Sequence, residues 1–106
     1  MVLIIIVVII EDEYTMIKKV YLAIEITNNN FAPAYCKGDR ILLENRFPEL
    51  GERAVFTNGT KVYFRYFKME GDMYCLECLN GRGEDMYLRR MDEMDCLGTC
   101  ISVIRK

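Results

Sequence analysis

The stretch RAVFTNGTKVYFRYFK, residues 53–68, contains a complete hairpin signal. An Asn58-Gly59 dipeptide stands between two runs rich in β-branched and aromatic residues, which are typical of strands. Asn-Gly favours a type I′ turn, since both central residues of that turn need a positive φ. We therefore predict an antiparallel hairpin that turns at Asn58-Gly59. In its second arm, alternation gives one face to Val62, Phe64 and Tyr66 and the other to Tyr63, Arg65 and Phe67.

Further strand signals lie on both sides of this hairpin, separated by Gly, Pro and Asn turn signals. The sequence shows no repeats and no linker, so we expect a single domain over residues 1–106. Its fold class is mostly β: a curled, antiparallel β-domain with little helix. The other predicted strands lie at residues 17–27, 40–44, 73–79 and 97–105, and residues 86–91 form either a short strand or one helical turn.

The opening MVLIIIVVII, residues 1–10, raises the question of a membrane anchor. A spanning helix needs roughly 20 apolar residues, and this run ends at an acidic group. Its β-branched content favours a strand. An open strand of this kind would aggregate, so we expect the fold or a partner to cover it, and we expect no membrane contact.

Composition excludes several functions. The net charge is −2 and the pI is near 5.2, which gives no electrostatic basis for direct nucleic-acid binding. The chain has no His and a single Ser, Ser102, so Ser-His and Cys-His catalysis are absent. Five cysteines without a secretory signal indicate reduced thiols in a cytoplasmic protein.

Four of those cysteines have a spacing that suggests zinc. Cys75 and Cys78 are followed, after 17 intervening residues, by Cys96 and Cys100. A zinc-binding module using these four thiolates is therefore an alternative function. Against it, Cys75 and Cys78 stand in a predicted strand, where an odd separation places them on opposite faces. We expect buried structural thiols, with no metal and no cofactor.

Five segments follow one another along the chain: AIEITNNNFAP (23–33), KGDRILLE (37–44), AVFTNGTKVYFRYFK (54–68), LECLN (76–80) and GTCISVIR (98–105). Taken together in this order, they resemble the C-terminal domain of LexA-like repressors. These are the self-cleaving repressors of the SOS response and of phages, related in fold to the signal peptidases. The resemblance covers about residues 20–106 and implies a LexA/signal-peptidase-like β-domain.

The resemblance also implies where the family's Ser-Lys dyad would lie. Phe31 and Pro33 match the family's Met and Pro, so Asn30 falls at the position of the nucleophilic Ser. The general-base Lys falls on Arg65. The rest of the motif frame is Gly38, Asp39 and Gly98.

Both replacements remove the chemistry. A carboxamide offers no activated hydroxyl, and an arginine keeps its proton and so cannot act as the base. The chain also contains no Ala-Gly dipeptide as a cleavage site. We expect an inactive peptidase homologue. A small shift in the alignment would bring Thr27 and Lys61 into those roles, which leaves residual peptidase activity as a second alternative.

Association is the function that remains for such a domain. In LexA-like repressors this domain dimerises and pairs two DNA-binding headpieces. No headpiece is present in the chain, so it is either part of a longer regulator or a free-standing relative that contacts a partner protein. We expect a homodimer through the closing strand, which alternation makes apolar at Ile101 and Val103 on one face and at Cys100 and Ile104 on the other. The competing expectation is that the domain's own sheet covers that strand, with residues 1–10 as the lid.

Overall fold

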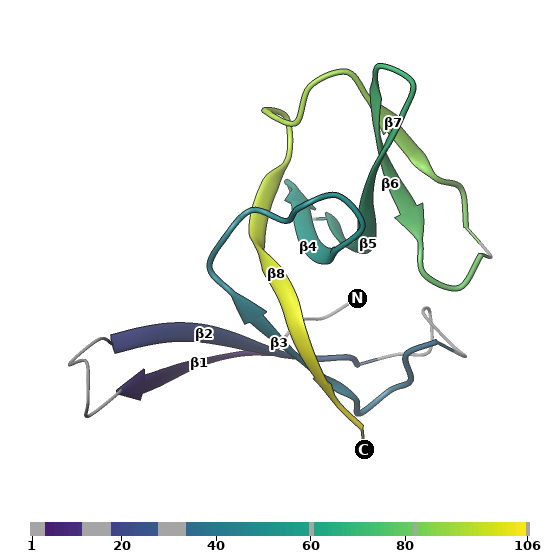
Figure 1. The fold of residues 1–106 in the computed structure, drawn as a ribbon. Helices are drawn as coiled ribbons and strands as arrows, with labels where there is room; N and C mark the ends of the chain where they lie inside the picture. The colour runs from purple at the N-terminus through teal and green to yellow at the C-terminus, as the bar shows by residue number, and fades with distance from the viewer. Residues whose placement is uncertain (1–3, 12–17, 28–33, 60, 82, 106) are drawn as a thin grey trace.

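The computed structural model describes residues 4–11, 18–27, 34–59, 61–81 and 83–105, with side chains described from Leu22 onward. These residues form eight β-strands in one sheet and no helix, which confirms the predicted mostly-β class (Figure 1). No helix in this part of the chain could therefore cross a membrane. The strands are β1 (Ile4–Glu11), β2 (Lys18–Glu25), β3 (Arg40–Glu44), β4 (Arg53–Asn58), β5 (Lys61–Glu70), β6 (Met73–Cys78), β7 (Met86–Leu88) and β8 (Asp95–Ile104).

The order of strands in the sheet is β1-β2-β3-β8-β4-β5-β6-β7, and every pairing is antiparallel. The closing strand β8 lies inside the sheet, since its first half pairs with β4 and its second half with β3. The domain's own sheet therefore covers this strand in part, as the competing expectation holds. Residues 100–104 nevertheless pair with β3 alone among the described strands.

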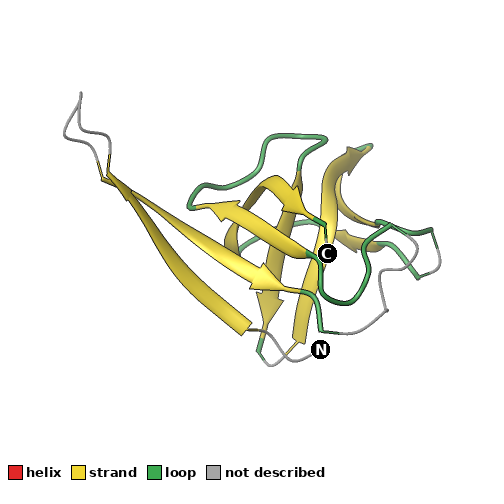
Figure 2. Cartoon of the chain, turned by 90° about the horizontal axis from the view of Figure 1, so that it is seen from below, coloured by secondary structure: helices red, strands yellow, loops and turns green. Residues whose placement is uncertain are grey.

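The lid in that competing expectation was wrong for residues 4–10. β1 pairs along its whole length with β2, and β2 and β3 separate it from β8 in the sheet. Figures 1 and 2 show the β1–β2 hairpin as an arm that extends away from the rest of the sheet. The first strand is therefore an outer strand of the sheet.

The β4–β5 hairpin is present where the sequence predicts it, with a turn one residue later. Asn58 is still part of the ladder, opposite Lys61, so the two-residue loop begins at Gly59. Gly59 has φ 61°, a backbone conformation that glycine adopts without steric cost. The Asn58-Gly59 pair therefore locates the hairpin but does not supply both central residues of the turn.

Two hydrophobic clusters hold the sheet, and β5 contributes to both. Phe64 lies in the first cluster and Phe67 in the second, as the predicted alternation requires. The neighbouring strand β4 also has both faces buried, since Ala54, Val55 and Phe56 are three consecutive buried residues. Val55 lies in the first cluster, and Ala54 and Phe56 lie in the second. Burying each phenylalanine contributes about 2 to 3 kcal/mol. The first cluster comprises Ile24, Ile26, Tyr35, Ile41, Leu43, Val55, Phe64 and Cys100, and the second comprises Ala54, Phe56, Phe67, Leu76 and Met94.

A β-bulge in β8 changes which residues of the closing strand share a face. Leu42 pairs with Ser102 and Leu43 pairs with Cys100, so Ile101 is the extra residue of the bulge. The bulge shifts the alternation, and Cys100 and Val103 both pack on the first cluster. The predicted pairing of Ile101 with Val103 on one face was therefore wrong. The exposed members are Ile101 and Ile104, at 41% and 58%.

Gly98 stands where β8 passes from β4 to β3. Its φ is 152°, and a Cβ at this position would lie 2.6 Å from the carbonyl oxygen of Glu44. Thr99, the next residue, pairs with both Ala54 and Glu44. Only glycine permits this close approach of two backbones, which explains this member of the motif frame.

Candidate functional site

The resemblance places the site on the loop between β2 and β3. Asn30, Phe31 and Pro33 lie outside the described residues, so the position of the nucleophile replacement stays a prediction. The structure describes both ends of the loop, residues 26–27 and 34–39. These two ends contact each other and form the frame of the loop.

Backbone hydrogen bonds tie the two ends of the loop together. The amide of Ile26 donates to the carbonyl of Asp39 at 2.9 Å, and the amide of Gly38 donates to the carbonyl of Ile26 at 2.8 Å. Gly38 has φ 94°, which an L side chain rarely adopts. The Gly38-Asp39 pair of the motif frame therefore closes the loop onto the end of β2.

Asp39 is buried, at 3% exposure, and its charge is compensated. Its Oδ2 accepts hydrogen bonds from the amide of Cys36 and from Nη1 of Arg105, both at 2.9 Å. Because a buried carboxylate without partners would cost several kcal/mol, these donors account for its presence in the interior. The motif aspartate therefore anchors the loop to the residue that follows β8.

Two arginines hold Tyr35 at the end of the loop. Arg105 Nη1 also donates to the carbonyl of Ala34 at 2.8 Å, and its guanidinium lies 5.0 Å from the centre of the Tyr35 ring. Arg53 Nη1 donates to the Tyr35 hydroxyl. The same ring packs at 5.0 Å on Phe64 of β5. The loop end is thus fixed to β8, β4 and β5 together.

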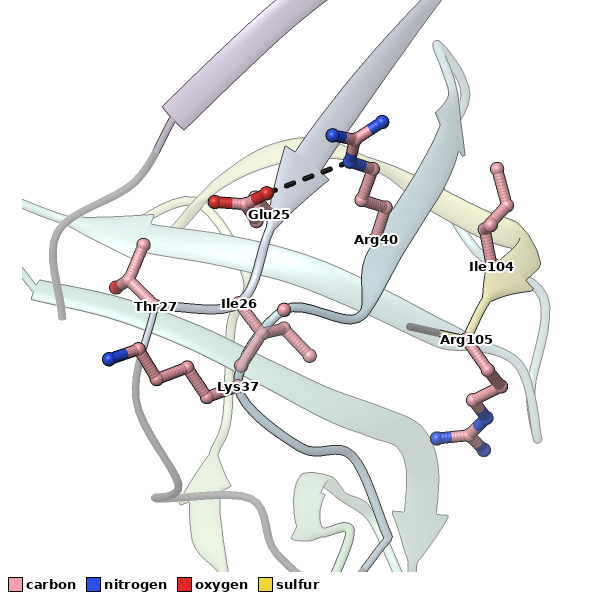
Figure 3. Close-up of a pocket in the computed structure, with 8 residues that line it drawn as sticks. Glu25, Ile26, Thr27, Lys37, Arg40, Ile104 and Arg105 are labelled. Atoms are coloured by element: carbon pink, nitrogen blue, oxygen red, sulfur yellow. Dashed lines mark ion pairs between the residues drawn. The ribbon is translucent and has the colours of Figure 1, made fainter.

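A cleft of about 440 Å³ opens beside this frame (Figure 3). Three cationic side chains line it, from Lys37, Arg40 and Arg105. The one acidic side chain is Glu25, whose Oε1 lies 3.6 Å from Nε of Arg40. Thr27, the alternative hydroxyl, lines this cleft, whereas Lys61 lies at the β4–β5 turn opposite Asn58. The described lining residues are Glu25, Ile26, Thr27, Lys37, Gly38, Arg40, Ile104 and Arg105.

Arg65, at the predicted general-base position, uses its guanidinium to hold backbone. Nη1 donates to the carbonyl of Glu84 at 2.6 Å and to the carbonyl of Leu76 at 3.2 Å. The guanidinium also lies 5.4 Å from the centre of the Tyr63 ring. Arg65 therefore links β5 to β6 and to the segment before β7, which is a structural role.

The four cysteines of the zinc alternative lie in different surroundings. Cys100 belongs to the first hydrophobic cluster, while Cys96 packs against the second. Cys78 Sγ lies 3.3 Å from the carbonyl of Glu84. Burial raises the pKa of Cys75, Cys96 and Cys100, which disfavours the thiolate that zinc requires. Within the described ranges, no group of three or more Cys, Asp or Glu side chains is arranged to hold a metal.

The curled antiparallel sheet, with a loop frame closed by Gly38-Asp39, defines a LexA/signal-peptidase-like β-domain. A family model described as Peptidase S24-like matches residues 7–101. The chain therefore belongs to the Peptidase S24-like family. No curated protein matches it. The family match begins at residue 7, so it also includes most of β1, which lies outside the segments that carry the sequence resemblance.

Sequence reasoning missed the contacts that hold the loop. Arg105 and Asp39 were both in matched segments, yet nothing in the sequence pairs two residues that are 66 positions apart. Tyr35 and Arg53 carried no motif at all. An isolated aromatic residue shortly after a Pro in a polar loop is the one local signal, because such a residue often anchors a loop to the core.

Proposed function

We propose that this chain is a non-catalytic S24-like domain that serves as the dimerisation or regulatory module of a cytoplasmic transcriptional repressor, or of a stand-alone relative. The open side of β8 at residues 100–104 is the observation that carries the proposal. A DNA-binding headpiece or a partner protein outside this chain would supply target recognition. Pairing two such chains would match a two-fold operator.

Catalytic silence follows from the residue at the base position. A Ser-Lys dyad needs a lysine that releases its proton, and an arginine side chain cannot act as that base. Arg65 instead donates hydrogen bonds to two backbone carbonyls. Asn30 supplies no hydroxyl to attack a peptide bond. With Asn30 and Arg65 assigned to these positions, both halves of the dyad are replaced.

Incubation at alkaline pH tests whether the chain lacks self-cleavage activity. High pH favours a neutral lysine and promotes self-cleavage in LexA-like repressors, so an active dyad would be revealed at an alkaline pH. We expect the intact mass of 12.4 kDa to persist in mass spectrometry. A discrete cleavage that disappears in Thr27→Ala or Lys61→Ala would contradict the proposal and assign the dyad to those residues.

Association is supported by the exposed apolar residues along the open side of β8. Ile101 and Ile104 are 41% and 58% exposed next to backbone groups that no described strand pairs. A two-fold mate of the same segment would satisfy those groups and cover both side chains. Cys100, by contrast, is only 6% exposed and contributes to the core of its own domain.

Light scattering over a tenfold dilution series tests the association. We expect wild-type protein to scatter as more than one chain, and Ile101→Lys with Ile104→Lys to lower the mass, because like charges in a buried seam repel. Leu50→Lys is the matched control, since Leu50 is also exposed, at 59%, but lies far from β8 in sequence and outside any described strand. An unchanged mass in the double variant would refute the β8 seam.

A further inference from the structure

The two outer strands of the sheet differ in how they are protected. β7 is only three residues long, and such a short edge strand resists pairing with another chain. β1 has eight residues, Ile4–Glu11, and contains no Pro, Gly or Lys. Its ladder to β2 runs without a register shift, whereas both ladders of β8 are interrupted. β1 therefore lacks the usual protection of an edge strand.

The sequence of β1 restricts what can cover its outer edge. Residues 4–10 are all Ile or Val, and one backbone edge of the strand has no partner among the described strands. A lipid bilayer would not satisfy those backbone groups, because open sheet edges do not occur within the hydrocarbon region. Another β-strand of similar aliphatic sequence would satisfy them.

We propose that β1 pairs antiparallel with β1 of a second copy of this chain, about a two-fold axis through Val7. In that register Ile4 pairs with Ile10 of the second copy and Val7 pairs with Val7, so each of the seven residues of 4–10 meets an Ile or Val. Glu11 falls beyond the paired segment, so no like charges oppose each other. The strand is thus complementary to itself, which a two-fold interface requires.

This seam is separate from the one proposed on β8, because β2 and β3 lie between the two strands in the sheet. The arm of Figure 2 carries β1 away from the rest of the sheet, so a second copy has access to it. A chain with both seams forms assemblies larger than a dimer. The two seams can therefore be broken one at a time.

Cysteine cross-linking tests the register directly. In the proposed seam the Cα atoms of residue 7 in the two copies lie about 4.5 to 5.5 Å apart, within disulfide range. The two copies of residue 4 lie about 20 Å apart, which is too far. We expect oxidised Val7→Cys protein to yield a peptide pair linked through position 7 in mass spectrometry. The matched control, Ile4→Cys, should yield no pair linked through position 4. Both variants carry Cys36→Ser, since Cys36 is the exposed native thiol.

Light scattering separates this seam from the β8 seam. In the Ile101→Lys, Ile104→Lys background we expect a dimer of about 25 kDa, twice the chain mass of 12.4 kDa, which becomes a monomer when Val7→Lys is added. If the β8 seam does not exist, Val7→Lys should still convert the dimer to a monomer. The β1 proposal is overturned, even if Val7→Lys does not fold, when the disulfide of the Val7→Cys variant does not form. The same holds when it forms no faster than the disulfide of the Ile4→Cys variant.

Discussion

Replacing Gly98 with Ala adds a Cβ where β8 leaves β4 and joins β3. The new atom would lie 2.6 Å from the Glu44 carbonyl oxygen and 3.0 Å from Leu43 Cβ, on a backbone with φ 152°. The unusual φ costs about 1 to 2 kcal/mol and the overlap with fixed backbone about 1 to 3 kcal/mol. We therefore expect Gly98→Ala to lower the free energy of unfolding by about 3 kcal/mol. That loss is large beside a total of about 5 to 15 kcal/mol for a small domain.

Urea unfolding followed by circular dichroism measures the loss, provided that the m-value is unchanged. Gly81→Ala is the matched control, since Gly81 also has a positive φ of +68° but nothing lies within 4 Å of the added Cβ. We expect the control to lose about 1 kcal/mol from backbone strain alone. If the two variants differ by less than about 1 kcal/mol, the close approach of β8 to Glu44 does not require glycine, and the reasoning fails.

Three further predictions concern charges and thiols. Pairing with Arg46 lowers the pKa of Glu52 from 4.5 to about 2, so its stabilisation is present above pH 4.5 and is lost as the pH falls toward 2. Glu52→Gln should therefore cost about 1 kcal/mol at neutral pH, given that the pair is partly exposed, and urea unfolding should show this difference vanishing near pH 2. A double-mutant cycle on Asp39→Asn and Arg105→Gln should give a coupling energy of about 1 kcal/mol, and a coupling near zero would contradict the loop anchor. Elemental analysis of protein purified without chelator should find far less than one zinc per chain, and stoichiometric zinc lost on Cys75→Ala would favour the metal-binding alternative.

The local elements of this protein could be predicted from its sequence. The hairpin at residues 53–68, the strand RILLE and the two faces of β5 all follow from side-chain periodicity and turn residues, which act over a few positions. The ordered motif segments were also sufficient to identify the S24-like family. The position of the hairpin turn was predicted to within one residue, since the turn begins one residue later than the Asn-Gly dipeptide indicates.

How those elements combine could not be predicted from the sequence and became clear from the folded chain. The insertion of β8 between β3 and β4, the bulge at Ile101 and the bond from Arg105 to Asp39 each join segments that are far apart in sequence. Strand periodicity reports which face of a strand is buried, but it does not report which strands are neighbours. Nor does it reveal a bulge, because one inserted residue reverses the alternation that periodicity assumes. The open side of β8 and the outer position of β1 therefore emerged only from the assembled sheet.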